Sequence, residues 1–189
     1  MYRALTWWFI SENADTGNAA LVTERAAEPS IEVSTDPDEP WTRVNGRDVS
    51  RDIRTPEVSA QVSAVARVPA VREHLIGMQR AIIASADPGV VAEGRDIGTV
   101  VAPAARLKVF LTADPGARAR RRAAELGGNA DETEAAQARR DRLDAAQSEK
   151  AADALLLDAT DLTLEQVIGE IAQLARERSL LACVGDKTS

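Results

Sequence analysis

The run Leu107-Lys108-Val109-Phe110-Leu111 is followed almost at once by Asp114-Pro115, and this strand-to-helix step decides the fold class. An apolar run of this length predicts a buried strand, and Asp-Pro predicts the start of a helix, which we expect to run to Gly127-Gly128. The step recurs at residues 154–157, a second apolar run that precedes a helix predicted over 162–177. Buried strands that alternate with helices predict an α/β fold with a parallel sheet and right-handed connections.

The segment from residue 30 to residue 49 has a different pattern. Apolar and polar residues alternate over 31–34 and again over 41–44, with the turn-forming stretch Asp36-Pro37-Asp38-Glu39-Pro40 between them. Asn45-Gly46 follows as a second turn signal. Alternation of this kind predicts antiparallel strands, so we expect a small antiparallel subdomain inserted into the α/β fold.

Helices and one further strand are predicted around this insert. Bulky apolar residues at 5, 8 and 9 predict a short opening helix, and Thr55-Pro56 predicts a helix with Thr as its N-cap. Residues 69–86 carry an apolar stripe at helical spacing, and residues 131–147 form a polar helical pattern. The short apolar run Val90-Val91-Ala92 predicts a strand that ends at the polar loop after it.

The composition excludes several classes of function. The 189 residues carry a net charge of −7, which argues against a general nucleic-acid binder. One cysteine and one histidine exclude a disulfide framework and most zinc sites, and we predict no protein-held metal. No apolar run approaches the roughly 18 residues of a membrane span, so we expect a cytoplasmic protein without a membrane partner. Arginine supplies 20 of the 23 basic residues, which favours recognition of phosphate or carboxylate groups.

Three polar segments are candidates for a functional site. The loop Glu93–Thr99 follows a predicted strand and is either a ligand-binding loop or a turn closed by an internal Arg–Asp pair. Four arginines at 118, 120, 121 and 122 either bind an anion or form a solvated basic face. Arg140 and Asp144 lie four positions apart, so they either pair along a helix or present a cation and a carboxylate to one ligand.

These motifs together resemble bacterial cytidylate (CMP/dCMP) kinases. The resemblance is carried by residues 93–101 and 107–113, by Asp48–Val58 and Val68–Arg72, and by the pair Arg140 and Asp144. It begins at Met1 and continues to about residue 178. Because these motifs are long and occur in the family's order, they are far more specific than a single glycine motif.

The resemblance implies an α/β nucleoside monophosphate kinase of the P-loop type, with a small inserted nucleotide-binding subdomain and a lid. It implies transfer of the ATP γ-phosphoryl group to CMP or dCMP with Mg²⁺, by an enzyme that is a monomer in its full-length form. The implied core domain comprises 1–29 and 50–181, the insert 30–49, and the disordered tail 182–189. The implied residues are Arg3, Arg54, Arg72 and Arg95 around the acceptor, Asp96, Arg140 and Asp144 at the cytosine and sugar, and Arg121 and Arg122 as lid residues that act in catalysis.

The chain departs from the family pattern on the ATP side. Residues 1–189 contain no Gly-x-x-x-x-Gly-Lys-[Ser/Thr] motif, so we expect the first strand and the P-loop to be missing and this chain to be inactive alone. Gln147 replaces an arginine usual in relatives, and the loop over 148–152 is shortened. A CMP-binding pseudo-kinase and a non-catalytic, dimerising remnant are alternatives. A start assigned at an internal Met would explain the pattern, with Thr-Gly-Ala and a phosphate loop encoded upstream.

Overall fold

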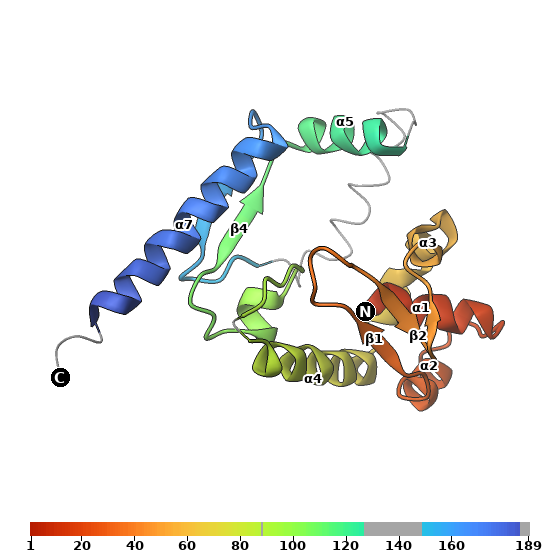
Figure 1. The fold of residues 1–189 in the computed structure, drawn as a ribbon. Coiled ribbons are helices and arrows are strands. Elements are labelled where there is room, and N and C mark those ends of the chain that lie inside the picture. The colour runs from red at the N-terminus through yellow and green to blue at the C-terminus, as the bar shows by residue number, and fades with distance from the viewer. Residues whose placement is uncertain (88, 127–148, 186–189) are drawn as a thin grey trace. The chain divides into compact units, whose positions relative to one another are not determined.

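The computed structural model describes residues 1–87, 89–126 and 149–185 of the chain. These residues fall into two compact units, Met1–Ala92 and Glu93–Ser189. Figure 1 draws the elements of both units in colours that run from red at the N-terminus to blue at the C-terminus. Each unit has its own secondary structure and is described by itself.

The first unit contains four α-helices and one short 3₁₀ helix among its described residues. They are α1 (Tyr2–Ser11), α2 (Ala19–Arg25), η1 (Asp52–Arg54), α3 (Pro56–Ala66) and α4 (Pro69–Ser85). The predicted cap is confirmed, since the Thr55 side chain accepts a hydrogen bond from the Val58 N–H at 3.4 Å and Pro56 begins α3. The short helix α2 was not predicted, although Asn18 accepts a hydrogen bond from the Leu21 N–H at 3.1 Å and is its N-cap.

The predicted antiparallel strands are confirmed as a small sheet in the same unit. β1 (Ile31–Val33) pairs with β2 (Thr42–Val44), and β2 pairs with β3 (Arg47–Asp48). The β2–β3 connection is Asn45-Gly46, whose φ angles of 51° and 79° lie in the left-handed region. Two positive φ angles define the turn type that matches the twist of a two-residue hairpin, and Asn-Gly is its preferred sequence.

One hydrophobic core joins the helices of the first unit to this sheet. Helix α1 packs against α3, η1 and β2, and its residues Leu5 and Phe9 are fully buried. Ile31, Val44 and Val49 from the predicted insert belong to the same buried cluster. The division between the two units lies after Ala92. The inserted substrate-binding subdomain at 30–49 stays a prediction.

The second unit contains the parallel sheet that the strand-to-helix step predicts. Strand β4 (Val109–Thr112) pairs in parallel with β5 (Leu155–Asp158), from Val109 opposite Leu155 to Thr112 opposite Asp158. The other elements among its described residues are the π-helical turn η2 (Ile97–Val101), α5 (Pro115–Leu126) and α7 (Leu164–Gly185). The chain thus has an α/β fold with a parallel sheet, as expected. No helix among the residues of the three described ranges has the length and apolar character that crossing a membrane requires.

Two local predictions differ from the structure, and a third lies where the structure gives no description. The stretch Val90-Val91-Ala92 forms no strand, and Val91 is 95% exposed, because no neighbouring strand pairs with it. Helix α7 continues to Gly185, so residues 182–185 of the predicted tail are helical. The predicted helix over 131–147 lies outside the described residues.

Candidate functional site

The segment Arg95-Asp96 leads directly into the π-helical turn η2. The Asp96 carbonyl accepts hydrogen bonds from the Val100 N–H at 2.8 Å and the Val101 N–H at 3.2 Å, and the Ala102 N–H donates to the Ile97 carbonyl at 2.7 Å. Bonds to the fifth residue along the chain define a π turn, a feature that is rare and frequent at functional sites. Asp96 is 8% exposed, whereas Arg95 is exposed. The turn therefore holds one buried carboxylate and one accessible guanidinium side by side in the sequence.

The two glycines of the segment allow different degrees of contact. A Cβ atom at Gly94 would lie 2.8 Å from Cγ1 of Ile97, closer than such atoms approach in proteins, so the Ile97 side chain closes directly over this glycine. A Cβ atom at Gly98 would lie 3.5 Å from Cδ of Lys108, an ordinary van der Waals distance. A side chain at position 94 would therefore force Ile97 to shift, whereas a Cβ atom at position 98 would make only ordinary contacts.

Two predicted substrate-binding arginines, Arg3 and Arg54, lie on elements of the first unit that pack against each other, α1 and η1. Both terminal nitrogens of Arg3, on α1, donate to the Ser59 hydroxyl oxygen, at 3.1 and 2.7 Å. The Ser59 hydroxyl in turn donates to the Thr55 carbonyl at 2.9 Å, so the first turn of α3 orients the Arg3 guanidinium. Exposed Arg54 ends η1, which packs against both α1 and α3. Arg72 is half-buried on α4.

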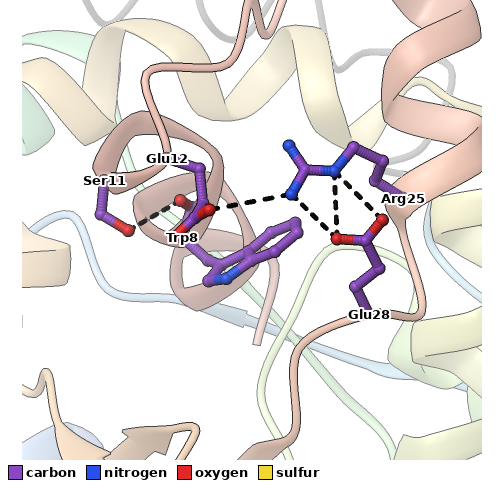
Figure 2. A network of polar contacts seen from close by, with 5 residues as sticks. All are labelled: Trp8, Ser11, Glu12, Arg25 and Glu28. Atoms are coloured by element: carbon purple, nitrogen blue, oxygen red, sulfur yellow. Dashed lines mark hydrogen bonds and ion pairs between the residues drawn. The ribbon is translucent and has the colours of Figure 1, made fainter.

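Arg25 was not predicted to bind a ligand, and its guanidinium forms contacts within the first unit. Figure 2 shows Arg25 between Glu28, with which it forms a 2.9 Å ion pair, and Glu12, at 3.8 Å. The guanidinium carbon also lies 4.8 Å from the centre of the Trp8 ring. The hydrogen bond from Arg25 lowers the pKa of Glu28 below its ordinary value. These contacts connect the end of α2 to the end of α1, so Arg25 has a structural role.

Polar side chains connect the carboxyl ends of β4 and β5 in the second unit. The Asp158 carboxylate accepts from both the backbone N–H and the hydroxyl of Thr160, at 2.9 and 2.6 Å. Thr160 Oγ1 accepts from the Asp114 N–H at 2.8 Å, and Asp114 caps α5 by accepting from the Gly116 N–H at 2.9 Å. The hydrogen bond from the Thr160 hydroxyl lowers the pKa of Asp158. This network fixes where α5, with its arginines, begins.

Arg121 of α5 is held by the loop that follows β5. Its Nη2 atom donates to the carbonyls of Ala159, Thr160 and Leu162, at 2.6, 3.2 and 2.9 Å. This arrangement differs from a lid arginine that points freely at a phosphate, because the guanidinium already has backbone acceptors. All three acceptors are neutral carbonyls. Arg122 also belongs to α5, and its side chain lies outside the described part of the structure.

The predicted site residues are divided between the two units, each of which is described by itself. Arg3, Arg54 and Arg72 belong to the first unit, and Arg95, Asp96 and Arg121 to the second. Arg140, Asp144 and Gln147 lie outside the described residues. The roles assigned to all of these residues stay predictions.

Sequence reasoning missed two hydroxyl residues that orient these groups. Ser59 binds Arg3 across 56 residues of chain, and Thr160 binds Asp114 across 46 residues. A single Ser or Thr carries no motif, and only the fold brings each one to its partner. The one available signal was local, since Asp158 and Thr160 form a short polar turn directly after an apolar strand.

The described residues do not supply a metal site of their own. They contain no group of three or more His, Cys, Asp or Glu side chains that could hold a metal ion. Residues 1–189 also contain no Gly-x-x-x-x-Gly-Lys-[Ser/Thr] motif, which would supply a lysine and a hydroxyl to nucleotide phosphates. The residues of the described ranges therefore do not fit a Mg²⁺ site, and no step through a metal ion is derived from them.

Comparisons with known proteins show a consistent similarity over almost the whole chain. The family model for cytidylate kinase matches residues 1–177. A cytidylate kinase of Streptomyces avermitilis is 45% identical over 182 residues, which cover 94% of this chain and 79% of that protein. A cytidylate kinase of Mycobacterium avium is 42% identical over 191 residues, 96% of this chain and 83% of that protein. The bifunctional pantoate ligase/cytidylate kinase of Thermosynechococcus vestitus is 42% identical over 191 residues and is covered over 37% of its length.

Proposed function

The chain belongs to the cytidylate kinase family, and we propose that it serves the ATP-dependent phosphorylation of CMP and dCMP to CDP and dCDP. The observation that supports this proposal is the match to the family model, which extends from residue 1 to residue 177 and includes each predicted site residue. Catalysis of this reaction needs little covalent chemistry from the protein. It needs positioned positive charge and the exclusion of water around the transferred phosphoryl group.

The acceptor nucleotide is the substrate that these residues would recognise. The arginines at 3, 54, 72 and 95 would bind its phosphate or its base, and Asp96, Arg140 and Asp144 would bind its cytosine and sugar. A guanidinium suits this role because it stays charged and can donate two parallel hydrogen bonds to phosphate oxygens. The exposure of Arg95 and Arg54 supports this assignment, since neither is covered by the packing of its unit. The Ser59 hydroxyl would hold Arg3 in position for its ligand.

Arg121 and Arg122 of α5 would act as the lid arginines that approach the phosphates. Arg121 would have to exchange at least one of its three carbonyl partners for a phosphate oxygen in that role. Such an exchange is favourable in charge, because a phosphate is an anion and a carbonyl is neutral. The closed network around Asp158 and Thr160 would keep the start of α5 fixed while its arginines change partners.

The ATP side of the reaction is not provided by these residues. ATP with Mg²⁺ is the phosphoryl donor that the family implies, and the metal ion neutralises charge on the β- and γ-phosphates when it is bound. Residues 1–189 contain no Gly-x-x-x-x-Gly-Lys-[Ser/Thr] loop to cradle these phosphates. We therefore propose that this stretch of chain supplies acceptor binding and the lid, and that the first strand and P-loop of the fold are not among its residues.

The remaining assignments follow from the family alone. We propose a monomeric, cytoplasmic enzyme in the full-length form, with the β1–β3 segment at 30–49 as the nucleotide monophosphate-binding subdomain. Size-exclusion chromatography with light scattering tests the oligomeric state. A monomer agrees with the proposal, and a stable dimer contradicts it.

Calorimetry with CMP tests the proposed substrate. The 189-residue chain is titrated with CMP and dCMP, and with AMP as the matched control that carries the same phosphate on a different base. The proposal predicts saturable binding of CMP or dCMP and at least tenfold weaker binding of AMP, a difference of about 1.4 kcal/mol. Equal binding of CMP and AMP, or no binding of CMP by the folded chain, contradicts it.

A further inference from the structure

Lys108 is an almost buried lysine whose ammonium group has all of its donors occupied. Its side chain is 7% exposed, although it precedes the first residue of β4. The Nζ atom donates to both carboxylate oxygens of Asp153, at 2.9 and 2.8 Å, and to the Pro103 carbonyl. A lysine ammonium has three N–H donors, so these three acceptors satisfy it completely. Burial of a charged group is tolerated under this condition.

Lys108 and its two partner residues come from three different segments of the second unit. Pro103 follows the π-helical turn η2 by two residues, Asp153 lies two residues before β5, and Lys108 itself leads into β4. The Lys108 carbonyl also accepts the Leu155 N–H at 2.9 Å, which ties the same residue to β5. Lys108 is therefore the point at which the end of the π turn is fastened to the parallel sheet.

The aliphatic part of Lys108 also supports the turn itself. Its Cδ and Cγ atoms lie 3.5 and 3.8 Å from where a Cβ of Gly98 would be, within the loop Glu93–Thr99. Asp96 is bound to the same turn, because its carbonyl accepts from the N–H groups of Val100 and Val101. A displacement of η2 would therefore move Asp96 and the neighbouring Arg95.

We propose that Lys108 and Asp153 form a positioning pair that holds the Arg95–Asp96 segment in place for the acceptor nucleotide. This inference rests on the proposed function, in which Arg95 and Asp96 bind CMP. Neither Lys108 nor Asp153 touches the nucleotide in this account. They act through η2, and their effect on the reaction is on acceptor affinity.

The choice of lysine at this position supports the pair. The chain has three lysines against 20 arginines, so lysine is the exception in this protein. A compact ammonium can direct its donors at a carbonyl and a carboxylate from different directions, whereas a planar guanidinium presents a fixed fork. Lys108→Arg is therefore not a conservative change here, and we expect it to disturb η2 as Lys108→Met does.

The test compares four variants of the whole 189-residue chain in calorimetry with CMP. Lys108→Met keeps the aliphatic stem and removes the ammonium, Asp153→Asn removes the opposite charge at a side chain that is 65% exposed, and the double variant combines them. Lys150→Met is the matched control, because the Lys150 ammonium donates within its own segment before β5, to the Ala154 carbonyl at 2.8 Å. Hydrogen exchange at the Val100, Val101 and Ala102 amides reports on the turn directly.

We expect Lys108→Met and Asp153→Asn each to weaken CMP binding on the order of tenfold, which corresponds to about 1.4 kcal/mol. The double variant should be no weaker than the single ones, because residues of one pair are not additive. Exchange at the three amides should accelerate in these variants and stay unchanged in Lys150→Met. A role in stability alone predicts a lower melting temperature with unchanged CMP affinity of the folded protein.

Two results overturn the proposal. One is wild-type CMP affinity in folded Lys108→Met, and the other is an additive double variant. If Lys108→Met does not fold, Asp153→Asn decides, since its side chain is exposed. If the wild-type chain binds no CMP, the proposed function fails. The positioning pair is then tested by hydrogen exchange alone, and unchanged exchange at the η2 amides in Asp153→Asn would refute it.

Discussion

Replacement of Arg121 by alanine tests the arrangement at the end of the parallel sheet. In the structure Arg121 Nη2 donates hydrogen bonds to the carbonyls of Ala159, Thr160 and Leu162. A lid arginine that is free until nucleotide binds would make none of these contacts. The two views predict different behaviour of the loop 159–162 in the absence of any ligand.

The expected magnitude follows from the geometry of these bonds. Nη2 has two hydrogens for three acceptors, so the contacts at 2.6 and 2.9 Å account for most of the interaction. A hydrogen bond from a charged donor contributes about 1.5–3 kcal/mol when it is buried. Because two of the three contacts are exposed and water replaces them, we expect Arg121→Ala to lower the local stability of the loop by about 2 kcal/mol in total.

Hydrogen exchange measures this local stability. The Leu162 N–H donates to the Ala159 carbonyl at 3.3 Å inside the loop, and a loss of about 2 kcal/mol accelerates its exchange roughly 30-fold. Arg120→Ala is the matched control, because Arg120 is exposed on the same helix and its loss removes the same charge. We expect this control to exchange as the wild type does.

Equal exchange rates in Arg121→Ala and Arg120→Ala would refute the reasoning. The side chain of Arg121 would then be free in solution, and the loop after β5 would be held by the Asp158–Thr160 turn alone.

Three further predictions concern the fold, its pH dependence and the reaction. Phe9→Ala should lower the free energy of unfolding of the first unit by about 3–5 kcal/mol, because Phe9 is fully buried. Urea unfolding followed by tryptophan fluorescence measures this change, since all three tryptophans lie in residues 1–92. A decrease below about 1 kcal/mol would contradict the prediction. The hydrogen bonds from Thr160 lower the pKa of Asp158, so the ionised carboxylate stabilises the folded state above the unfolded-state pKa of about 3.9, and this stabilisation is lost as the pH falls through the lower folded-state pKa. The urea midpoint should therefore fall less steeply below about pH 4 in Asp158→Asn than in the wild type. Identical pH profiles of the two proteins would contradict this prediction. The 189-residue chain with ATP, Mg²⁺ and CMP should form no measurable CDP in a coupled assay, because its sequence lacks the phosphate loop, and formation of CDP would show that other residues bind the ATP phosphates.

The parts of the fold that the sequence predicts are those set by local signals. Thr55-Pro56 predicts the start of α3, Asn45-Gly46 predicts the turn between β2 and β3, and the run at 107–111 predicts β4. Each depends on capping, turn or strand chemistry within a few residues. The apolar run at 90–92 failed as a strand because strand formation also requires a pairing partner, which no local pattern reveals.

The site was predicted as a set of residue types and only in part as an arrangement. From the residues alone, the loop Glu93–Thr99 and the arginines at 118–122 were either anion-binding or structural, and the resemblance to cytidylate kinases favoured binding. The orientation of these groups depends on long-range partners, such as Ser59 for Arg3 and Asp153 for Lys108, which are 56 and 45 residues away. Arg121 was assigned to a lid from its family position, and its three carbonyl partners are set by the packing of α5 against the loop after β5.

The most direct test of the proposed acceptor site is the affinity of Arg95→Ala for CMP. A charge-assisted and bidentate contact to phosphate contributes about 1.5–3 kcal/mol, so calorimetry should show roughly 10- to 150-fold weaker binding than the wild type. Arg106→Ala, at an exposed position in the same unit, removes the same charge and should bind CMP as the wild type does. Unchanged CMP affinity in Arg95→Ala, in a chain whose wild type binds CMP, would contradict the assignment of this segment to the acceptor site.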